Sequence, residues 1–205
     1  MGAPGIIGGM ATDHVVLRPD DEGVDAYRLL TALVVPRPIA WVSTISADGV
    51  GNLAPYSFFT VASADPPVVQ VTSVGEKDTL RNARATGELT ISLASEPLID
   101  AVNATSAGVD PDVDEADRVG LAMAPSRVVT PPRVAGSPAS LECRLRTTVP
   151  VGGATLLLAD VVAFTIDPAV LDGDHPRFDL LAPLARLGGT EWGLPGEVVT
   201  RDRPS

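Results

Sequence analysis

The densest group of anion-binding residue types lies in residues 73–82. Lys77 is the only lysine of the chain, and Ser73 and Thr79 lie close to it in sequence. A strand is predicted to end and a helix to begin here, so free backbone N–H groups and the positive end of the helix dipole would face one place. This predicts a site for an anionic group such as a phosphate. The alternative is ordinary helix capping by Asp78, with Lys77 solvated. The pattern is not a Walker loop.

A second group combines aromatic and small polar residues between positions 41 and 59. Four of the eight aromatic residues of the chain fall in this stretch. Aromatic walls with a few hydroxyl and amide groups suit a pocket for a flat, partly polar ring. The alternative is an ordinary barrel core with polar residues facing outward. The residues concerned are Trp41, Tyr56, Phe58, Phe59, Ser43, Thr44, Asn52 and Ser57.

Side chains that could catalyse a reaction by themselves are scarce. Cys143 alternates within an apolar pattern, which predicts a buried, inert thiol. His14 and His175 are far apart, which argues against a zinc site and against a Ser-His-Asp site. The carboxylates of residues 110–117 lack EF-hand spacing and are interpreted as a solvated loop and helix start. We therefore predict no catalytic residue and no metal site, and expect the demanding chemistry to come from a cofactor.

The charge balance limits the partners. The 205 residues carry 15 basic and 26 acidic side chains, for a net charge of −11. Such a surface disfavours binding to nucleic acid or to anionic membranes. No run approaches the roughly 20 apolar residues of a membrane span, and the first nine residues lack the basic region of a signal peptide. We expect a cytoplasmic protein that binds neither nucleic acid nor membranes.

The apolar periodicity, with 19 glycines and 19 prolines, predicts short strands joined by turns rather than a helical bundle. Closing the strands into a small antiparallel barrel would remove exposed sheet edges. Residues 104–112 are expected to form an exposed loop. Helices are predicted over 20–33, 78–86, 97–103 and 114–121. Strands are predicted over 39–46, 52–61, 67–73, 88–94, 140–149 and 154–166.

One domain is expected. Residues 1–19 are Gly-rich and without periodicity, which predicts a flexible N-terminal arm. Residues 20–195 would form the barrel domain. Residues 196–205 are polar and would form a frayed C-terminal tail.

Eight runs, taken in order, resemble the flavin reductase-like family with an FMN-binding split barrel. The resemblance covers about residues 25–192, and the number and order of the runs make it specific. It implies a mainly β, antiparallel Greek-key split barrel with short flanking helices. It also implies a homodimer with FMN near the interface. The runs are 27–30, 35–44, 48–49, 52–59, 65–69, 77–82, 141–143 and 181–189.

The resemblance further implies which residues would hold FMN. Those at the edge of the isoalloxazine would be Trp41, Val42, Ser43 and Thr44. Those against the ring and ribityl chain would be Asn52, Ala54, Pro55, Ser57 and Phe58. Those at the phosphate would be Ser73, Lys77 and Thr79, which agrees with the anion site predicted above. Those closing the site, from the partner subunit in one interpretation, would be Arg186 to Gly189, including Gly188, and Trp192.

The sequence departs from the family pattern in three places. Family members often have Gly-Glu-Val followed by His in the late strand, where this chain has residues 159–165. They usually have Tyr where Trp192 stands. Residues 114–121 lack the aromatic of the family's acidic segment. The last departure bears on the choice of substrate.

The function that the resemblance implies is an NAD(P)H:flavin oxidoreductase that passes hydride or electrons through FMN. One alternative is an FMN electron carrier to a partner protein, similar to flavoredoxin, that reacts poorly with NAD(P)H. A non-enzymatic barrel used for assembly and an oxidase of a small amine or vitamin are further alternatives. The sequence leaves open NADH against NADPH, and FMN as a fixed group against FMN as a released substrate.

Overall fold

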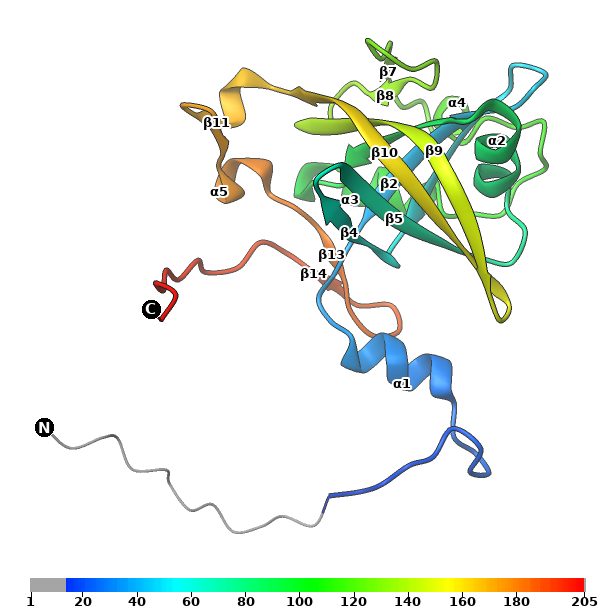
Figure 1. Ribbon diagram of the computed structural model, residues 1–205, viewed down its shortest axis with the longest axis vertical. Coiled ribbons are helices and arrows are strands. Elements are labelled where there is room, and N and C mark those ends of the chain that lie inside the picture. Colours follow the sequence, from blue (N-terminus) through cyan, green and yellow to red (C-terminus); the bar gives the residue numbers. More distant parts are fainter. Residues whose placement is uncertain (1–13, 205) are drawn as a thin grey trace, which may run out of the picture.

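The computed structural model describes residues 14–204, and a single curved sheet organises it (Figure 1). Within these residues the sheet has seven strands in the order β3-β2-β6-β9-β10-β5-β4. Every neighbouring pair is antiparallel. The strands are β2 (Ala40–Ile45), β3 (Gly51–Tyr56), β4 (Phe59–Ala64), β5 (Pro67–Val74), β6 (Glu88–Leu93), β9 (Ala139–Val151) and β10 (Ala154–Ile166).

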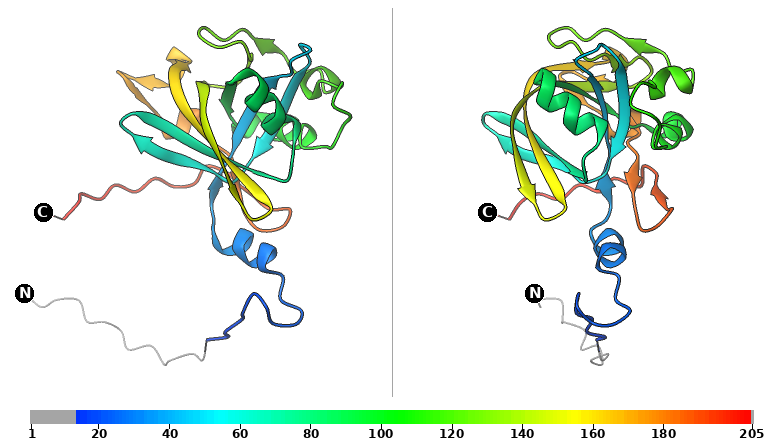
Figure 2. Two further views of the ribbon diagram at one scale, coloured as in Figure 1. Left: turned by 45° about the vertical axis from the view of Figure 1, so that its right-hand side comes forward. Right: turned by 90° about the vertical axis from the view of Figure 1, so that its right-hand side faces the viewer.

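The sheet closes on itself at Ser57 and Phe58. Strands β3 and β4 are the two edges of the sheet, yet only these two residues separate them in the chain. Three peptide links span about 10 Å at most, so the two edges must lie near one another. Thr72 N of β5 donates to Phe58 O at 2.9 Å, which ties the junction to the far side of the sheet. Figure 2 shows the resulting barrel from two sides.

Short helices and small sheets surround the barrel. Helix α2 (Asp78–Thr86) links β5 to β6 across the intervening β10 and β9, which is the Greek-key feature of the fold. The other helices are α1 (Ala26–Leu33), α3 (Ile99–Ala104), α4 (Glu115–Arg118) and α5 (Phe178–Leu181), with single 3-10 turns at Glu96–Leu98 and Pro168–Val170. The smaller sheets comprise β1 (Arg37–Pro38), β13 (Ala185–Arg186) and β14 (Trp192–Gly193); β7 (Met123–Ala124) and β8 (Arg133–Val134); and β11 (Leu171–Asp172) and β12 (His175–Pro176). The expected mainly β, antiparallel barrel with short flanking helices is confirmed.

Strand β2 is buried on both faces, because it lies between two apolar clusters. Ala40 and Val42 point to the barrel interior, where they pack with residues of β5, β6, β9 and β10. Trp41 points the other way, into a second cluster that α3 and α4 cover and that includes Val102 and Ala116. Burial on both faces agrees with the apolar run Ile39–Val42, while the buried Thr44 hydroxyl accepts hydrogen bonds from Asn52 and Asn82.

Two predicted elements differ from the structure. The predicted helix 20–33 begins only at Ala26, because the preceding residues form turns around Gly23, whose φ is +80°. Asp25 then caps α1 through its side chain, which accepts from Arg28 N. The predicted strand 52–61 is two strands, because the chain turns at the Ser57–Phe58 junction. The apolar pattern runs through the junction without a Gly or Pro to mark it.

The remaining predictions match closely. The structure has a helix at 78–86 with Gly87 after it in the left-handed region, as predicted. The predicted helix 97–103 corresponds to the 3-10 turn and α3 together, and the predicted helix 114–121 is shorter, at α4. The predicted long hairpin is β9–β10, joined at Gly152 and Gly153. Most of the predicted arm 1–19 lies outside the described residues, so that interpretation stays a prediction. Residues 196–204 have no regular structure.

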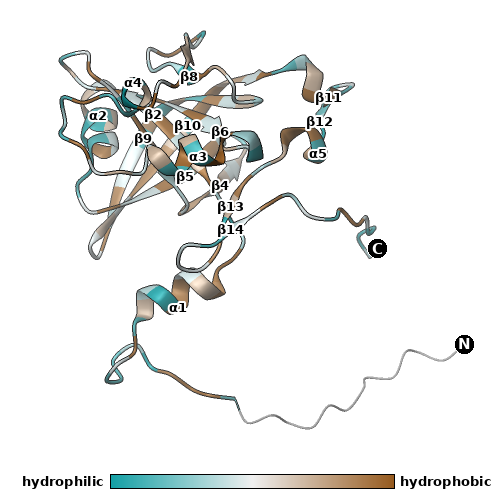
Figure 3. Cartoon of the chain, turned by 180° about the vertical axis from the view of Figure 1, so that it is seen from behind, coloured by the Kyte–Doolittle hydropathy of each residue, from teal (hydrophilic) through white to brown (hydrophobic). Residues whose placement is uncertain are grey.

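Helix α1 stands apart from the barrel wall, below it in Figure 1. Its side chains include Tyr27, Leu30 and Leu33, which are 64%, 60% and 77% exposed. Figure 3 shows apolar residues along this projecting helix. The helix therefore presents several large apolar side chains to solvent in one chain.

Candidate functional site

A cavity of about 460 Å³ opens beside the Ser57–Phe58 junction of the barrel. Its volume falls within the range of roughly 300–1,000 Å³ that is usual for small-molecule and cofactor pockets. Strand β3 and the junction form one wall, the start of α2 and the end of β5 form another, and residues 105–109 close a third. The lining residues are Tyr27, Asn52, Ala54, Pro55, Tyr56, Ser57, Phe58, Thr72, Val74, Glu76, Lys77, Asp78, Thr79, Thr105, Ser106, Ala107, Gly108, Val109 and Glu115.

One end of the cavity is the start of α2. Lys77 is exposed, occupies the N-cap position and makes no side-chain capping bond. Asp78 is therefore not the cap that the alternative interpretation required; it is the first helical residue and pairs with Arg81. The uncapped N–H groups of α2 and the ammonium of Lys77 meet at the cavity wall, which is the arrangement that holds an anion.

Buried hydrogen bonds fix this end of the cavity. Asn52 Nδ2 donates to Thr79 Oγ1 at 2.8 Å and to Thr44 Oγ1 at 3.2 Å. Asn82 Nδ2 donates to the same Thr44 oxygen at 3.3 Å. These bonds join β2, β3 and α2, so the helix start is held against the strand that forms the opposite wall. Polar side chains on a rigid frame keep a binding site preorganised.

Tyr56 lies between the two ends. Its hydroxyl is close to those of Thr79 and Ser73, and its ring packs against the barrel core. Burial raises the pKa of Tyr56, and the hydrogen bonds from Thr79 and Ser73 offset that effect only in part. Tyr56 therefore stays neutral and acts as a hydrogen-bonding group at neutral pH. Tyr56 belongs to the aromatic group predicted to line a ring pocket, although it is not among the FMN contacts that the resemblance implies.

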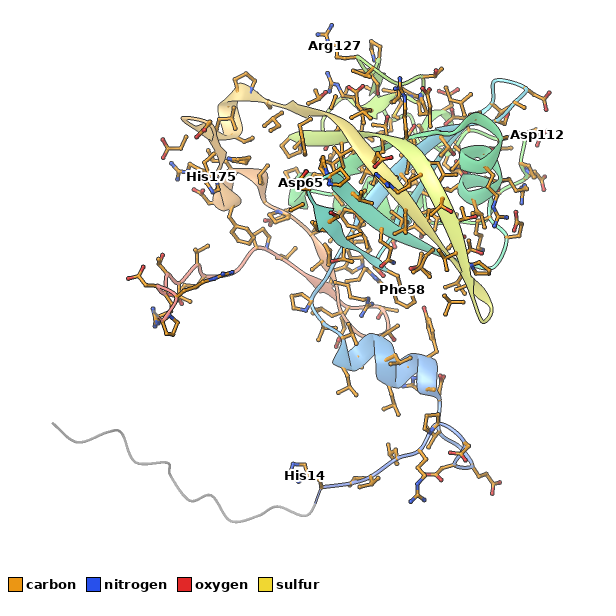
Figure 4. All side chains as sticks on the ribbon, viewed as in Figure 1. His14, Phe58, Asp65, Asp112, Arg127 and His175 are labelled. Atoms are coloured by element: carbon orange, nitrogen blue, oxygen red, sulfur yellow. The ribbon has the colours of Figure 1, made fainter. Side chains whose placement is uncertain are left out.

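The other end is apolar and begins at Phe58. Figure 4 places Phe58 on the side of the barrel that faces α1. Arg37 Cζ lies 6.0 Å from the centre of the Phe58 ring, and Arg37 Nε donates to Ser57 Oγ at 3.4 Å. Arg37 also donates to the carbonyls of Val34, at the end of α1, and Leu187. Burial, then the nearby Arg186, lowers the pKa of Arg37. This buried guanidinium ties α1 and the β13–β14 segment to the junction.

Seven of the predicted FMN-contact residues lie together in this cavity. They are Asn52, Ala54, Pro55, Ser57, Phe58, Lys77 and Thr79.

The four predicted residues of β2 lie in the core. Trp41, Val42 and Thr44 are fully buried and Ser43 is 2% exposed, so their side chains stand behind the cavity wall rather than at its surface. Trp41 reaches the cavity through one contact, because its Nε1 donates to Thr105 Oγ1 at 2.9 Å. Burial on both faces of β2 explains this placement. Strand β2 therefore contributes to a ligand site indirectly, through the hydrogen bond from Trp41 to Thr105 and through those that Thr44 accepts from Asn52 and Asn82.

Ser73 is also buried, and its hydroxyl donates to Gly75 O at 2.9 Å. It shapes the turn before Lys77. Arg186 and Trp192 line a separate hollow of about 150 Å³, which shares Pro55 and Ser57 with the main cavity wall. The guanidinium carbon of Arg186 lies 4.6 Å from the centre of the Trp192 ring.

Gly188 lies on the far side of that segment, against Ala32 of α1. Within one chain, the β13–β14 segment therefore contributes to two separate surfaces, with Arg186 and Trp192 at the small hollow and Gly188 against α1.

The acidic run is only partly the solvated loop that was predicted. Asp110 and Asp112 are exposed, and Asp114 caps α4 by accepting from Ala116 N at 2.8 Å. Glu115, however, is 6% exposed, lines the cavity and accepts from Leu53 N at 2.8 Å. Burial is the main cause of its raised pKa. No local pattern predicts this role, because Glu115 accepts from Leu53 N at the open edge of β3, which only tertiary packing brings near.

The segment 105–109 was predicted as an exposed loop and was not assigned to a site. It lines the cavity, and Thr105 is fixed there by donating to Val102 O as well as by accepting from Trp41. Small side chains without a motif gave no basis for finding this wall. Only the position of α3 against β3 brings it there.

The thiol and imidazole predictions agree with the structure. Cys143 is fully buried, and burial raises its pKa to about 12. His175 lies in the exposed β11–β12 hairpin, away from the cavity (Figure 4). Among residues 14–204 no group of three or more metal-ligating side chains occurs.

Residues 32–182 match the sequence profile of the family described as "Flavin reductase like domain". The chain belongs to the flavin reductase-like family. An uncharacterised protein of Halalkalibacterium halodurans is 37% identical to it over 202 residues, which covers 92% of this chain and 96% of the other.

Solved structures agree with this assignment. Nitrilotriacetate monooxygenase component B from Bacillus cereus superposes with a TM-score of 0.89 at 31% identity, over 93% of this chain and 100% of that one. The 2-nitrobenzoate 2-nitroreductase of Pseudomonas fluorescens gives a TM-score of 0.84 at 27% identity, over 94% and 97%. A split-barrel protein of Shewanella frigidimarina shares the fold at 18% identity, with a TM-score of 0.82 over 89% and 95%. The fold is therefore the split barrel that the resemblance implied.

Within the described part of the chain, none of the helices combines the length and the apolar character needed to cross a bilayer.

Proposed function

We propose that the cavity binds FMN and that the protein is an NAD(P)H:flavin oxidoreductase. The observation that carries this proposal is the polarity of the cavity. One end has the uncapped start of α2 with Lys77, and the other has Phe58 and Pro55. FMN has a phosphate at one end and a flat tricyclic ring at the other, so the residues present fit it.

In this proposal each part of the wall has one role. Lys77, Thr79 and the first N–H groups of α2 hold the phosphate, with Ser73 shaping the turn. Asn52, Ala54, Pro55, Ser57 and Phe58 line the ring and ribityl chain. Trp41 and Thr44 position the wall from behind, and Val42 and Ser43 complete the strand that supports them. Arg186 and Trp192, from the hollow beside Pro55 and Ser57, would close the site, and Gly188, which faces α1, would reach it only from the partner subunit of the proposed homodimer.

Bound flavin supplies hydride acceptance and donation, so the protein needs to bind, orient and exclude water rather than to abstract a proton. This agrees with Cys143 being buried with a raised pKa, and with His175 lying away from the cavity.

The experiment is an absorption spectrum of the purified protein, alone and after addition of FMN, followed by NADH or NADPH without oxygen. We expect flavin absorbance that stays with the protein on desalting or returns with added FMN, and bleaching by one of the two nucleotides. Failure of FMN to bind or to stabilise the protein against heat would refute the proposal and would favour a non-enzymatic barrel.

An electron carrier is the second candidate function. The Bacillus cereus neighbour is one component of a monooxygenase, which supports a role in which electrons leave for a partner protein. A carrier would bind FMN but be reduced slowly by NADH and NADPH. Stopped-flow reduction separates the two functions, because a reductase is bleached within its turnover time and a carrier is not.

We also propose that the protein is a cytoplasmic homodimer with FMN near the subunit interface. The support is the projecting helix α1, whose Tyr27, Leu30 and Leu33 are more than half exposed in one chain. Tyr27 also lines the cavity, so a partner that covers α1 would lie beside the bound flavin. The mass in solution, measured by light scattering, tests this directly.

A further inference from the structure

The charges around the cavity present a problem for an anionic ligand. Three carboxylates line the wall, at Glu76, Asp78 and Glu115, against the single ammonium of Lys77. FMN would add a phosphate that carries a charge of about −1.5 to −2 near neutral pH. The net charge of the cavity wall and the bound phosphate together would then be strongly negative. Water is partly excluded from the site, so this repulsion is poorly shielded and some of the charge must be neutralised when the ligand binds.

Two of the three carboxylates already have cations. Asp78 pairs with Arg81, one turn along α2. Glu76 lies 3.5 Å from Arg84, measured from Oε2 to Nη1. Both pairs remain partly exposed to solvent, so they are satisfied with or without a ligand.

Glu115 differs from both. It has no ion-pair partner among residues 14–204, and it is 6% exposed. Leu53 N donates to Oε2 at 2.8 Å, which leaves Oε1 as the atom able to carry a proton. A buried carboxylate that has no cation beside it is the group most readily protonated when negative charge is added nearby.

The negatively charged groups around Glu115 favour its protonated form. Asp114 on the same helical segment and Asp78 on α2 are both negative, and Tyr56 on β3 is a neutral phenol. Burial together with these two carboxylates raises the pKa of Glu115, and the bond from Leu53 N opposes them in part. Asp117 and Arg118, also on α4, line a separate recess on the other side of that helix.

We propose that Glu115 is the proton-holding residue of the cavity, which takes up a proton when FMN binds and so links flavin affinity to pH. This rests on the proposed FMN site. The neutral acid removes one negative charge from the wall while Leu53 N keeps its acceptor. Proton uptake distinguishes this role from that of a simple hydrogen-bond acceptor for Leu53 N, which a permanently charged carboxylate could also fill.

The test is calorimetric titration of the protein with oxidised FMN in two buffers of different ionisation enthalpy, from pH 7 to 8.5. This range lies above the second phosphate pKa of about 6, so the ligand itself changes little. We expect the wild type to take up as much as about one proton per FMN, and its Kd to rise by up to about tenfold per pH unit. Glu115→Gln should take up no proton and bind with a Kd that is independent of pH.

Glu76→Gln is the matched control. It removes one carboxylate from the same wall, but one that already has Arg84, so proton uptake should remain as in the wild type. Riboflavin is the matched ligand, because it lacks the phosphate and should bind with little uptake. The infrared difference spectrum of the wild type should gain a protonated-carboxyl band on FMN binding, and that band should be missing in Glu115→Gln.

The outcomes separate the two proposals. If FMN does not bind at all, the proposed function fails. If FMN binds without proton uptake, or if Glu115→Gln takes up as many protons as the wild type, the FMN site stands and the role of Glu115 is refuted. Should Glu115→Gln fold poorly, the infrared band and the buffer dependence of the wild type still decide the case.

Discussion

At the scale of the single residue, a change at Lys77 tests phosphate binding separately from binding of the flavin ring. Its ammonium is exposed at the start of α2, and it contacts the cavity but none of the apolar end. We expect Lys77→Ala to weaken FMN by about tenfold, the loss of roughly one charge-assisted hydrogen bond. Riboflavin should be affected far less. Fluorescence titration with both ligands measures this.

Arg177→Ala is the control for that change, because it removes an exposed cation that is paired with Asp179 and does not line the cavity. It should alter both affinities little. Equal losses of FMN and riboflavin in Lys77→Ala would contradict a phosphate role for Lys77.

Glu142 shows the opposite use of a buried carboxylate. It is fully buried and accepts from the backbone N–H groups of Arg127, Val128 and Val129 and from Thr165 Oγ1. Burial alone would raise the pKa of Glu142, but these donors together hold it below its ordinary value. The charged form therefore stabilises the folded loop 125–133, and this is a structural role.

A lowered pKa in the folded state fixes the sign of the pH dependence. The stability that Glu142 contributes is complete above its unfolded pKa of about 4.3 and is lost as the pH falls through the lower folded value. We expect Glu142→Gln to lower the free energy of unfolding by about 2 kcal/mol at pH 7. The difference from wild type should shrink in acid. Urea unfolding at pH 7 and pH 3.5 measures both, and an unchanged midpoint at pH 7 would contradict this role.

At the scale of the element, the approach of α4 to β3 depends on Gly51. A Cβ at this position would meet the carboxylate of Asp114, which caps α4. Displacing Asp114 removes the cap and shifts the adjacent Glu115. We expect Gly51→Ala to cost about 1 kcal/mol of unfolding free energy and to weaken FMN as well. Gly153→Ala is the control, because no atom lies within 4 Å of a Cβ built there.

Denaturant midpoints and FMN titrations of the two glycine variants give the comparison. If Gly51→Ala and Gly153→Ala behave alike, the Asp114 contact does not hold α4 in place.

The helices and strands also show which features of the fold local sequence patterns can predict. Alternation in residues 139–166 predicted the long hairpin, and Gly87 predicted the end of α2, because local rules govern both. The break at Ser57 and Phe58 was not predictable, since it is imposed by closure of the barrel and not by a local turn signal. The same holds for the site. Phe58 and Lys77 were found by residue type, whereas Glu115 and residues 105–109 reach the cavity only through tertiary packing.

At the scale of the whole molecule, the barrel supplies a rigid frame and α1 supplies an uncovered apolar surface. If α1 is the dimer interface, Leu30→Asp should convert a dimer to a monomer without unfolding it, because Leu30 is 60% exposed in one chain. Val128→Asp is the control. Val128 is 45% exposed and follows Arg127, which Figure 4 places at the end of the barrel opposite α1.

Light scattering gives the mass of each variant, and circular dichroism checks that it is folded. A wild type that is monomeric at working concentration, or a Leu30→Asp variant that stays dimeric, would exclude α1 as the interface.

The proposed function depends on FMN binding in the cavity beside the Ser57–Phe58 junction. A crystal structure of the protein grown with FMN would show whether it does. We expect density for the phosphate at Lys77 and the start of α2, with the tricyclic ring beside Phe58 and Pro55. Flavin density at another place, or side chains filling this cavity in crystals that contain FMN, would refute FMN binding at this site.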